Sequence, residues 1–226
     1  MTRAIRRPFV SALAAALLCS AAQAGDWIDQ RGEAPVRGDA AAGAAKAAVC
    51  VACHGPNGNA VIPAFPRLAG QRADYLYGEL RKYKRGTRPE SPMTAQAAPL
   101  GDADMRNLAA YFAAQAPTPS PAATPAAASG RGEALYRDGD PARGIPPCQG
   151  CHGVDAAGVP DARFAAWPAL RGQHADYLVA RLRSFRDGHL ADSSNDFVMR
   201  GVAATLDDAS IAAIAGYLAS LPPQAR

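Results

Sequence analysis

The sequence has 226 residues, a formal net charge of +4 and 49% hydrophobic residues. The basic residues are spread along the chain, which argues against a nucleic-acid-binding protein, because such proteins carry a clustered basic excess. Beyond the first residues, no segment is long and apolar enough to span a bilayer as a helix.

The first 24 residues have the pattern of a secretory signal peptide. Three arginines precede an apolar run over residues 9–18, and a small-x-small pattern ends at Ala24. We expect cleavage after Ala24 and export to the periplasm, which leaves 202 residues with a net charge of +1. An uncleaved membrane anchor and lipid attachment at Cys19 are the alternatives.

The remaining chain is a tandem duplication of one unit. We expect a first domain over residues 25–116, a Pro/Ala-rich linker over 117–129 and a second domain over 130–226. The second copy carries two insertions of four residues, because the spacing from His to Gln grows from 17 to 21 and from Gln to Met from 22 to 26. The matching segments are Cys50–His54 with Cys148–His152, Phe65–Gln71 with Trp167–Gln173, Ala73–Leu76 with Ala175–Leu178, Met93 with Met199 and Tyr111 with Tyr217.

The hydrophobic periodicity in both copies is helical and predicts an all-α fold. No run of alternating β-branched residues indicates a sheet. Thr205 and Asp208 form a plausible capping pair for the final helix. The apolar stripes are Tyr75, Leu76, Leu80 and Tyr83 with Tyr177, Leu178, Leu182 and Phe185, and Met105, Leu108 and Phe112 with Ile211, Ile214 and Leu218.

Each copy contains a Cys-x-x-Cys-His motif, which predicts a covalently attached haem c. Two thiols about one helical turn apart can add to the two vinyl groups of one haem, and the adjacent His then reaches the iron. Two copies in matching places of a repeat make the signal strong. The residues are Cys50, Cys53 and His54 in the first copy, and Cys148, Cys151 and His152 in the second.

Three other interpretations of the cysteines are weaker. The pairs of a zinc ribbon usually lie about 15–20 residues apart, whereas 94 residues separate Cys53 from Cys148. A thioredoxin-like dithiol needs a βαβ context, which is absent here. Two structural disulfides would not explain why a histidine, His54 or His152, directly follows each pair of cysteines.

A low-spin iron that only passes electrons needs a second axial ligand, and Met93 and Met199 are the candidates. They correspond in the two copies, whereas Met105 matches Ile211 and is expected in the core. The rival ligands are His174 and His189. Arg72 and Thr87 hold their positions in the first copy, so we expect both histidines at the surface.

Two further groups of residues could serve the haems. The carbonyls of Pro66 and Pro168 could accept a hydrogen bond from Nδ1–H of the axial His and orient its ring. The ordinary interpretation of these prolines is a turn. Arg67, Arg171 and Arg200 could neutralise haem propionates, although most arginines simply face solvent.

Together these residues resemble the cytochrome c4 family of dihaem cytochromes, which are built from two class-I cytochrome c domains. The resemblance is closest over residues 143–148, 168–174 and 197–204. It implies thioether links at the four motif cysteines and His–Met ligation of both irons. It also implies haems that lie close across the domain interface, and electron flow towards a terminal haem-copper oxidase.

The favoured function is a periplasmic electron carrier, not an enzyme, with redox proteins as partners. Its donor would be a quinol-oxidising complex or a dehydrogenase, and its acceptor a terminal oxidase or reductase. Peripheral association with the membrane stays open. The alternative is an enzyme or enzyme subunit, such as a dihaem peroxidase, a thiosulfate-oxidising dihaem protein or the cytochrome subunit of a dehydrogenase. A peroxidase needs one open iron site, whereas both copies here offer a Met in register.

Overall fold

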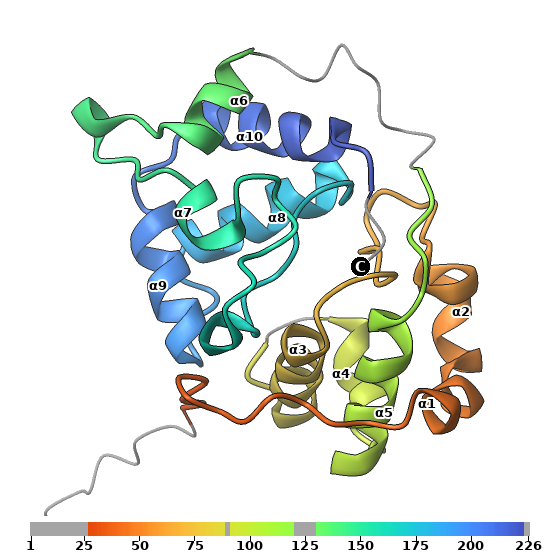
Figure 1. Ribbon diagram of the computed structural model, residues 1–226. Helices are drawn as coiled ribbons and strands as arrows, with labels where there is room; N and C mark the ends of the chain where they lie inside the picture. The colour runs from red at the N-terminus through yellow and green to blue at the C-terminus, as the bar shows by residue number, and fades with distance from the viewer. Residues whose placement is uncertain (1–26, 89–90, 120–129, 224–226) are drawn as a thin grey trace, which may run out of the picture.

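The computed structural model describes residues 27–88, 91–119 and 130–223, so the expected signal peptide and most of the expected linker lie outside the described residues. The described parts form two helical halves that lie side by side (Figure 1). They contain no strand, only the isolated bridges of Ile28 with Ser193 and of Asp140 with Ile145. The predicted all-α class is confirmed.

The two halves present the same helices in the same order. The first half has α1 (Ala40–Lys46), α2 (Val51–His54), α3 (Ala73–Arg85), α4 (Pro92–Ala97) and α5 (Asp102–Ala113), with 3-10 turns at Ala47–Cys50 and Pro56–Gly58. The second half has α6 (Gly130–Arg137), α7 (Gln149–His152), α8 (Ala175–Arg186), α9 (Ser194–Ala203) and α10 (Asp208–Ser220), with 3-10 turns at Pro141–Arg143 and Ala162–Phe164.

The first and last helices of each half cross at a glycine. A Cβ atom on Gly43 of α1 would lie 2.1 Å from the carbonyl oxygen of Asn107 in α5. A Cβ atom on Gly132 of α6 would lie equally close, at 2.1 Å, to the carbonyl oxygen of Ala213 in α10. Any larger residue would therefore push the two helices apart, which explains a glycine at both crossings.

The predicted apolar stripes build one core in each half, except for Tyr83 and Tyr177, which are part of neither core. Met105 and its counterpart Ile211 are both buried, as expected from their helical positions. The first core consists of Ala47, Leu76, Tyr77, Met105, Leu108, Ala109 and Phe112. The second contains, among others, Leu135, Tyr136, Leu178, Ile211, Ile214, Tyr217 and Leu218.

The expected capping pair of the last helix is wrong. The N-cap of α10 is Asp207, whose carboxylate accepts a hydrogen bond from the backbone N–H of Ser210 at 2.7 Å. Arg143 holds the same carboxylate at 2.8 Å. Thr205 lies two residues before this N-cap, and its hydroxyl donates to the carbonyl of Val202.

A segment that precedes α1 ties the first half to the second. The N–H of Ile28 donates to the carbonyl of Asp192 at 2.9 Å, and the N–H of Ser194 donates back to Ile28 at 3.0 Å. The N–H of Gln30 donates to the hydroxyl of Ser194 at 2.9 Å. Figure 1 shows this segment, in red and orange, running from the lower end of α9 to α1. The start of α9 is thus anchored by the other half.

A buried ion cluster also crosses the interface. Lys82 of α3 pairs with Glu79 on its own helix and with Asp196 of α9, whose Oδ1 lies 2.9 Å from Nζ. Glu79 also pairs with Arg88 and, at 3.5 Å, with Arg181 of α8. Burial alone would raise the pKa of Glu79, but the three cations outweigh it and lower that pKa to about 2.

No single helix among the described residues is long and apolar enough to cross a membrane. The α9–α10 pair meets the test of length and composition only when both helices are taken together, and they are bent by 117°.

Candidate functional site

In each half, a single helical turn carries the two cysteines and the histidine of the motif. α2 ends at His54 and α7 ends at His152, and a glycine follows each of them. Gly55 and Gly153 adopt φ angles of 71° and 82°, in the region that favours glycine. The chain therefore leaves the helix immediately after each histidine and turns back beneath it.

The four motif cysteines are free thiols, so the disulfide interpretation does not describe this structure. Burial raises the pKa of the Cys148 thiol to about 11. It also raises the pKa of Cys50 and Cys151. The thiols of Cys50, Cys148 and Cys151 are therefore protonated at neutral pH.

Both histidines are buried and oriented in the same way. His54 is 4% exposed and His152 is 7% exposed. Nδ1 of His54 lies 2.9 Å from the carbonyl oxygen of Pro66, and Nδ1 of His152 lies 3.0 Å from that of Pro168. Burial lowers the pKa of both rings, so they are neutral near pH 7. Because a carbonyl only accepts, Nδ1 carries the proton and Nε2 is the nitrogen left for iron.

The two methionines occupy matching helices. Met93 lies in the first turn of α4, where its N–H donates to the N-cap Ser91 at 3.2 Å. Met199 lies within α9, and both side chains are half-buried. Ligation of iron by these two sulfurs stays a prediction.

The rival histidines differ from each other. His189 is exposed, as expected. His174, expected at the surface, is buried, and its Nε2 bonds the carbonyl of Ala60 in the other half at 3.0 Å. Comparing the two copies of the sequence could not reveal the burial of His174, because the interface buries positions that would be exposed in a single copy.

Two of the three arginines considered for propionates have other partners. Arg67 is buried and donates to Asn59 and to Thr118. Arg171 donates to the carbonyls of Pro222 and Asp155. Arg200 is exposed.

The described residues fit a haem in each half. Large apolar side chains are exposed in both halves, several of them close in sequence to the motif residues or to Met199, and such a surface is what a bound apolar group covers. These side chains are Val49, Val51, Val61 and Ile62 in the first half, and Val154, Phe197 and Val198 in the second. Together with two free thiols and a buried imidazole in each half, they suit a covalently attached macrocycle.

Comparison with known proteins agrees with this chemistry. The family model for cytochrome c matches residues 40–115 and again 129–222. The cytochrome c4 of Azotobacter vinelandii is 44% identical over 199 residues, which cover 84% of this chain and 92% of that protein. The chain belongs to the cytochrome c4 family. Membership confirms the resemblance drawn from the motifs, the tandem cytochrome c fold and two covalently bound haem c groups.

A solved structure and a second kind of relative extend the comparison. Reduced recombinant cytochrome c4 from Pseudomonas stutzeri matches with a TM-score of 0.72 and 41% identity, over 82% of this chain and 100% of that chain. A thiosulfate dehydrogenase electron acceptor of Thiomonas intermedia is 39% identical, over 80% of this chain and 82% of that protein. As a cytochrome c4, the chain is a dihaem electron carrier.

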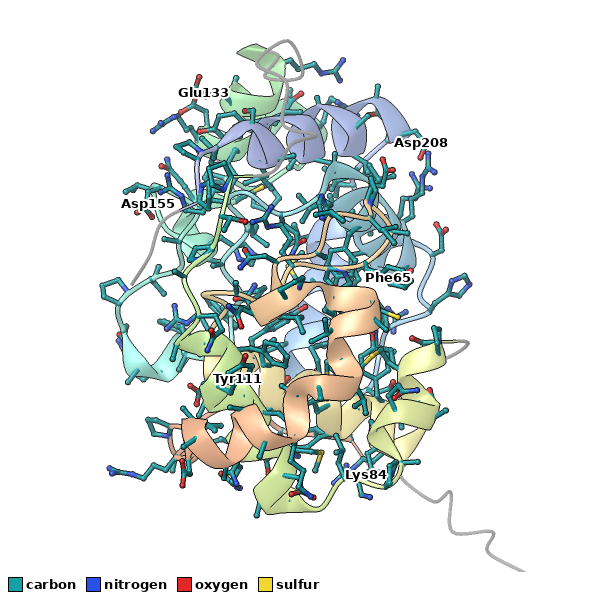
Figure 2. All side chains as sticks on the ribbon, turned by 90° about the vertical axis from the view of Figure 1, so that its right-hand side faces the viewer. Phe65, Lys84, Tyr111, Glu133, Asp155 and Asp208 are labelled. Carbon is teal, nitrogen blue, oxygen red and sulfur yellow. The ribbon has the colours of Figure 1, made fainter. Side chains whose placement is uncertain are left out.

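Sequence reasoning assigned no role to two glutamines that the structure places against the peptides whose carbonyls bind His54 and His152. Gln71 and Gln173 are both buried, and each reaches across the interface to the peptide that follows the other half's proline. Their presence in both copies was a signal, but the direction of their contacts depends on how the halves pack. Figure 2 shows Phe65, next to Pro66, between the helices of the first half and the blue helices of the second.

Proposed function

We propose that this cytochrome c4 accepts electrons in the periplasm from a quinol-oxidising complex or a dehydrogenase and passes them to a terminal oxidase or reductase. The axial pairs are His54 with Met93 and His152 with Met199. The observation that carries the proposal is the match between the halves: each has a buried histidine with Nδ1 bound to a proline carbonyl. Each also has a methionine on the helix after α3 or α8. An enzyme with an open iron would need the two halves to differ there.

The haem supplies the one-electron chemistry, and the residues of the chain make it fast and selective. The cysteines fix the edge of the macrocycle. The Pro66 and Pro168 carbonyls orient the imidazoles and raise their basicity. Burial of both histidines keeps water from the proximal side. A thioether from Met93 or Met199 as the second ligand would keep substrates off the iron. Because six ligands would stay in place in both oxidation states, the geometry of the site would change little on reduction.

The compartment and the boundaries belong to the same proposal. Residues 1–24 act as a cleaved signal peptide, since three arginines, an apolar run over residues 9–18 and a small-x-small pattern that ends at Ala24 are typical of one. The mature protein consists of a cytochrome c domain over 25–116, a linker over 117–129 and a second domain over 130–226. Its partners are redox proteins and not nucleic acids, and peripheral contact with the membrane suits delivery to an oxidase.

A second candidate function is to accept electrons from a thiosulfate-oxidising dehydrogenase. The similarity to the Thiomonas intermedia acceptor, at 39% identity, favours it. This role narrows the donor to one kind of dehydrogenase and leaves the chemistry of the chain unchanged.

The test is a stopped-flow comparison with the reduced holoprotein. Membranes that contain a terminal oxidase should oxidise both haems rapidly, whereas hydrogen peroxide should react slowly. Rapid turnover of peroxide with no oxidation by the membranes would overturn the carrier proposal in favour of an enzyme. Reduction of the ferric protein by a purified thiosulfate dehydrogenase with thiosulfate would assign the donor of the second candidate.

A further inference from the structure

Two peptide groups at the interface each link an axial histidine to a glutamine of the other half. In the second half, the carbonyl of the Pro168–Ala169 peptide accepts from Nδ1 of His152 at 3.0 Å. The N–H of the same peptide donates to Oε1 of Gln71 at 2.9 Å. Because a peptide is planar and trans, its N–H and C=O point in opposite directions, so the two bonds lie on opposite sides of one rigid group.

The first half has the same arrangement with the roles exchanged. The carbonyl of the Pro66–Arg67 peptide accepts from Nδ1 of His54 at 2.9 Å. The N–H of that peptide donates to Oε1 of Gln173 at 2.9 Å. The two halves therefore hold each other's histidine acceptors reciprocally.

Each glutamine is fixed by three hydrogen bonds. Nε2 of Gln71 donates to the carbonyl of Ala169 at 2.9 Å, and its Oε1 also accepts from the N–H of Arg72. Nε2 of Gln173 donates to the carbonyl of Arg67 at 3.0 Å, and its Oε1 also accepts from the N–H of His174. Because a backbone N–H only donates and a carbonyl only accepts, these contacts fix the orientation of both amides.

We propose that Gln71 and Gln173 are positioning residues that tune the reduction potential of the haem in the opposite half. An acceptor on the peptide N–H polarises the peptide and makes its carbonyl a stronger acceptor for the histidine. A stronger bond at Nδ1 makes the imidazole more basic and stabilises ferric iron, which lowers the potential. Each haem is thus adjusted by a side chain from the other domain. The proposal rests on the axial roles of His54 and His152 in the proposed function.

The experiment is a redox titration of the holoprotein carrying Gln71→Leu or Gln173→Leu. Met93→His and Met199→His lower the potential of the first or the second haem, and so assign each step to its half. We expect Gln71→Leu to raise the potential of the second haem and leave that of the first. Gln173→Leu should do the reverse. Gln71→Asn, which keeps the amide but is one methylene shorter, should act in the same direction if the leucine variant does not fold.

The matched control is His174→Leu. It removes another buried hydrogen bond across the same interface, to Ala60, without touching either proline peptide. Burial lowers the pKa of His174, so the ring is neutral and its loss changes no charge at pH 7. We expect neither potential to move.

A shift in the haem of the mutated half, equal shifts in both haems, a downward shift or no shift would overturn the proposal. An equal effect of His174→Leu would do so too, since it would mean general loosening of the interface. If Met93→His and Met199→His move neither step, the proposed ligands fail. If they separate the steps but the glutamine variants move nothing, only the positioning role fails.

Discussion

Lys82→Met tests whether the buried ion cluster holds the two halves together. Methionine has a similar length to lysine, so the substitution removes the charge and leaves most of the packing. The side chains of Lys82 and Asp196 are each only 2% exposed. Glu79 would keep Arg88 and Arg181 as partners. Asp196 would not be compensated, because its Oδ2 already has no hydrogen-bond partner among the described residues.

The expected loss follows from leaving one buried carboxylate without its cation. Removing one partner of a buried ion pair costs about 3–5 kcal/mol. A domain is stable by about 5–15 kcal/mol in total, so the loss would be a large fraction of it. The double variant Lys82→Met/Asp196→Leu should recover most of the loss, because it removes the stranded charge as well.

The assay is equilibrium unfolding of the ferric holoprotein in guanidinium chloride. The control is Lys46→Met, the same substitution at a surface ion pair, where Lys46 and Asp104 lie 3.0 Å apart and are 53% and 26% exposed. That pair should be worth less than about 1 kcal/mol. A Lys82→Met loss no larger than the Lys46→Met loss, or a double variant as unstable as the single one, would refute the reasoning.

Mass spectrometry of the purified protein should give the mass of residues 25–226 plus two haems, and one haem or a retained leader would contradict this. Met93→His and Met199→His should each remove about half of the near-infrared thioether-to-iron charge-transfer band, and an unchanged band would exclude that methionine. Glu79 has a pKa lowered from 4.5 to about 2, so its stabilisation of about 3 kcal/mol is present above its unfolded pKa and disappears as the pH falls from about 4.5 to about 2. Acid titration of the Glu79→Gln variant should show a smaller loss of stability over that range, and an identical loss would count against the cluster.

The sequence predicted most of what each half contains. The Cys-x-x-Cys-His motifs, the helical stripes and the matching methionines are local or repeated, so they are visible along one chain. Met105 was correctly placed in the core because Ile211, an apolar residue, occupies the same position in the other copy. The Pro66 and Pro168 carbonyls were named as acceptors because each follows its motif at a similar distance.

What depends on the packing of the two halves could not be predicted. His174 is buried where its ring bonds the carbonyl of Ala60 in the other half. Lys82 is buried for the same kind of reason, since its partner Asp196 belongs to the other half. The cap of α10 was misplaced because Thr205 and Asp207 are both good N-cap types, and only the start of the helix selects between them.

The most direct test of the account is a redox titration of the purified unmodified protein, followed by its visible spectrum. The two haems lie in similar but unequal surroundings, and each iron has six ligands in this account. The titration should therefore give two reversible one-electron steps per chain, with low-spin spectra in both the ferric and the ferrous state. A single one-electron step per chain, or a high-spin ferric haem in either half, would contradict the account of a dihaem carrier with both irons closed.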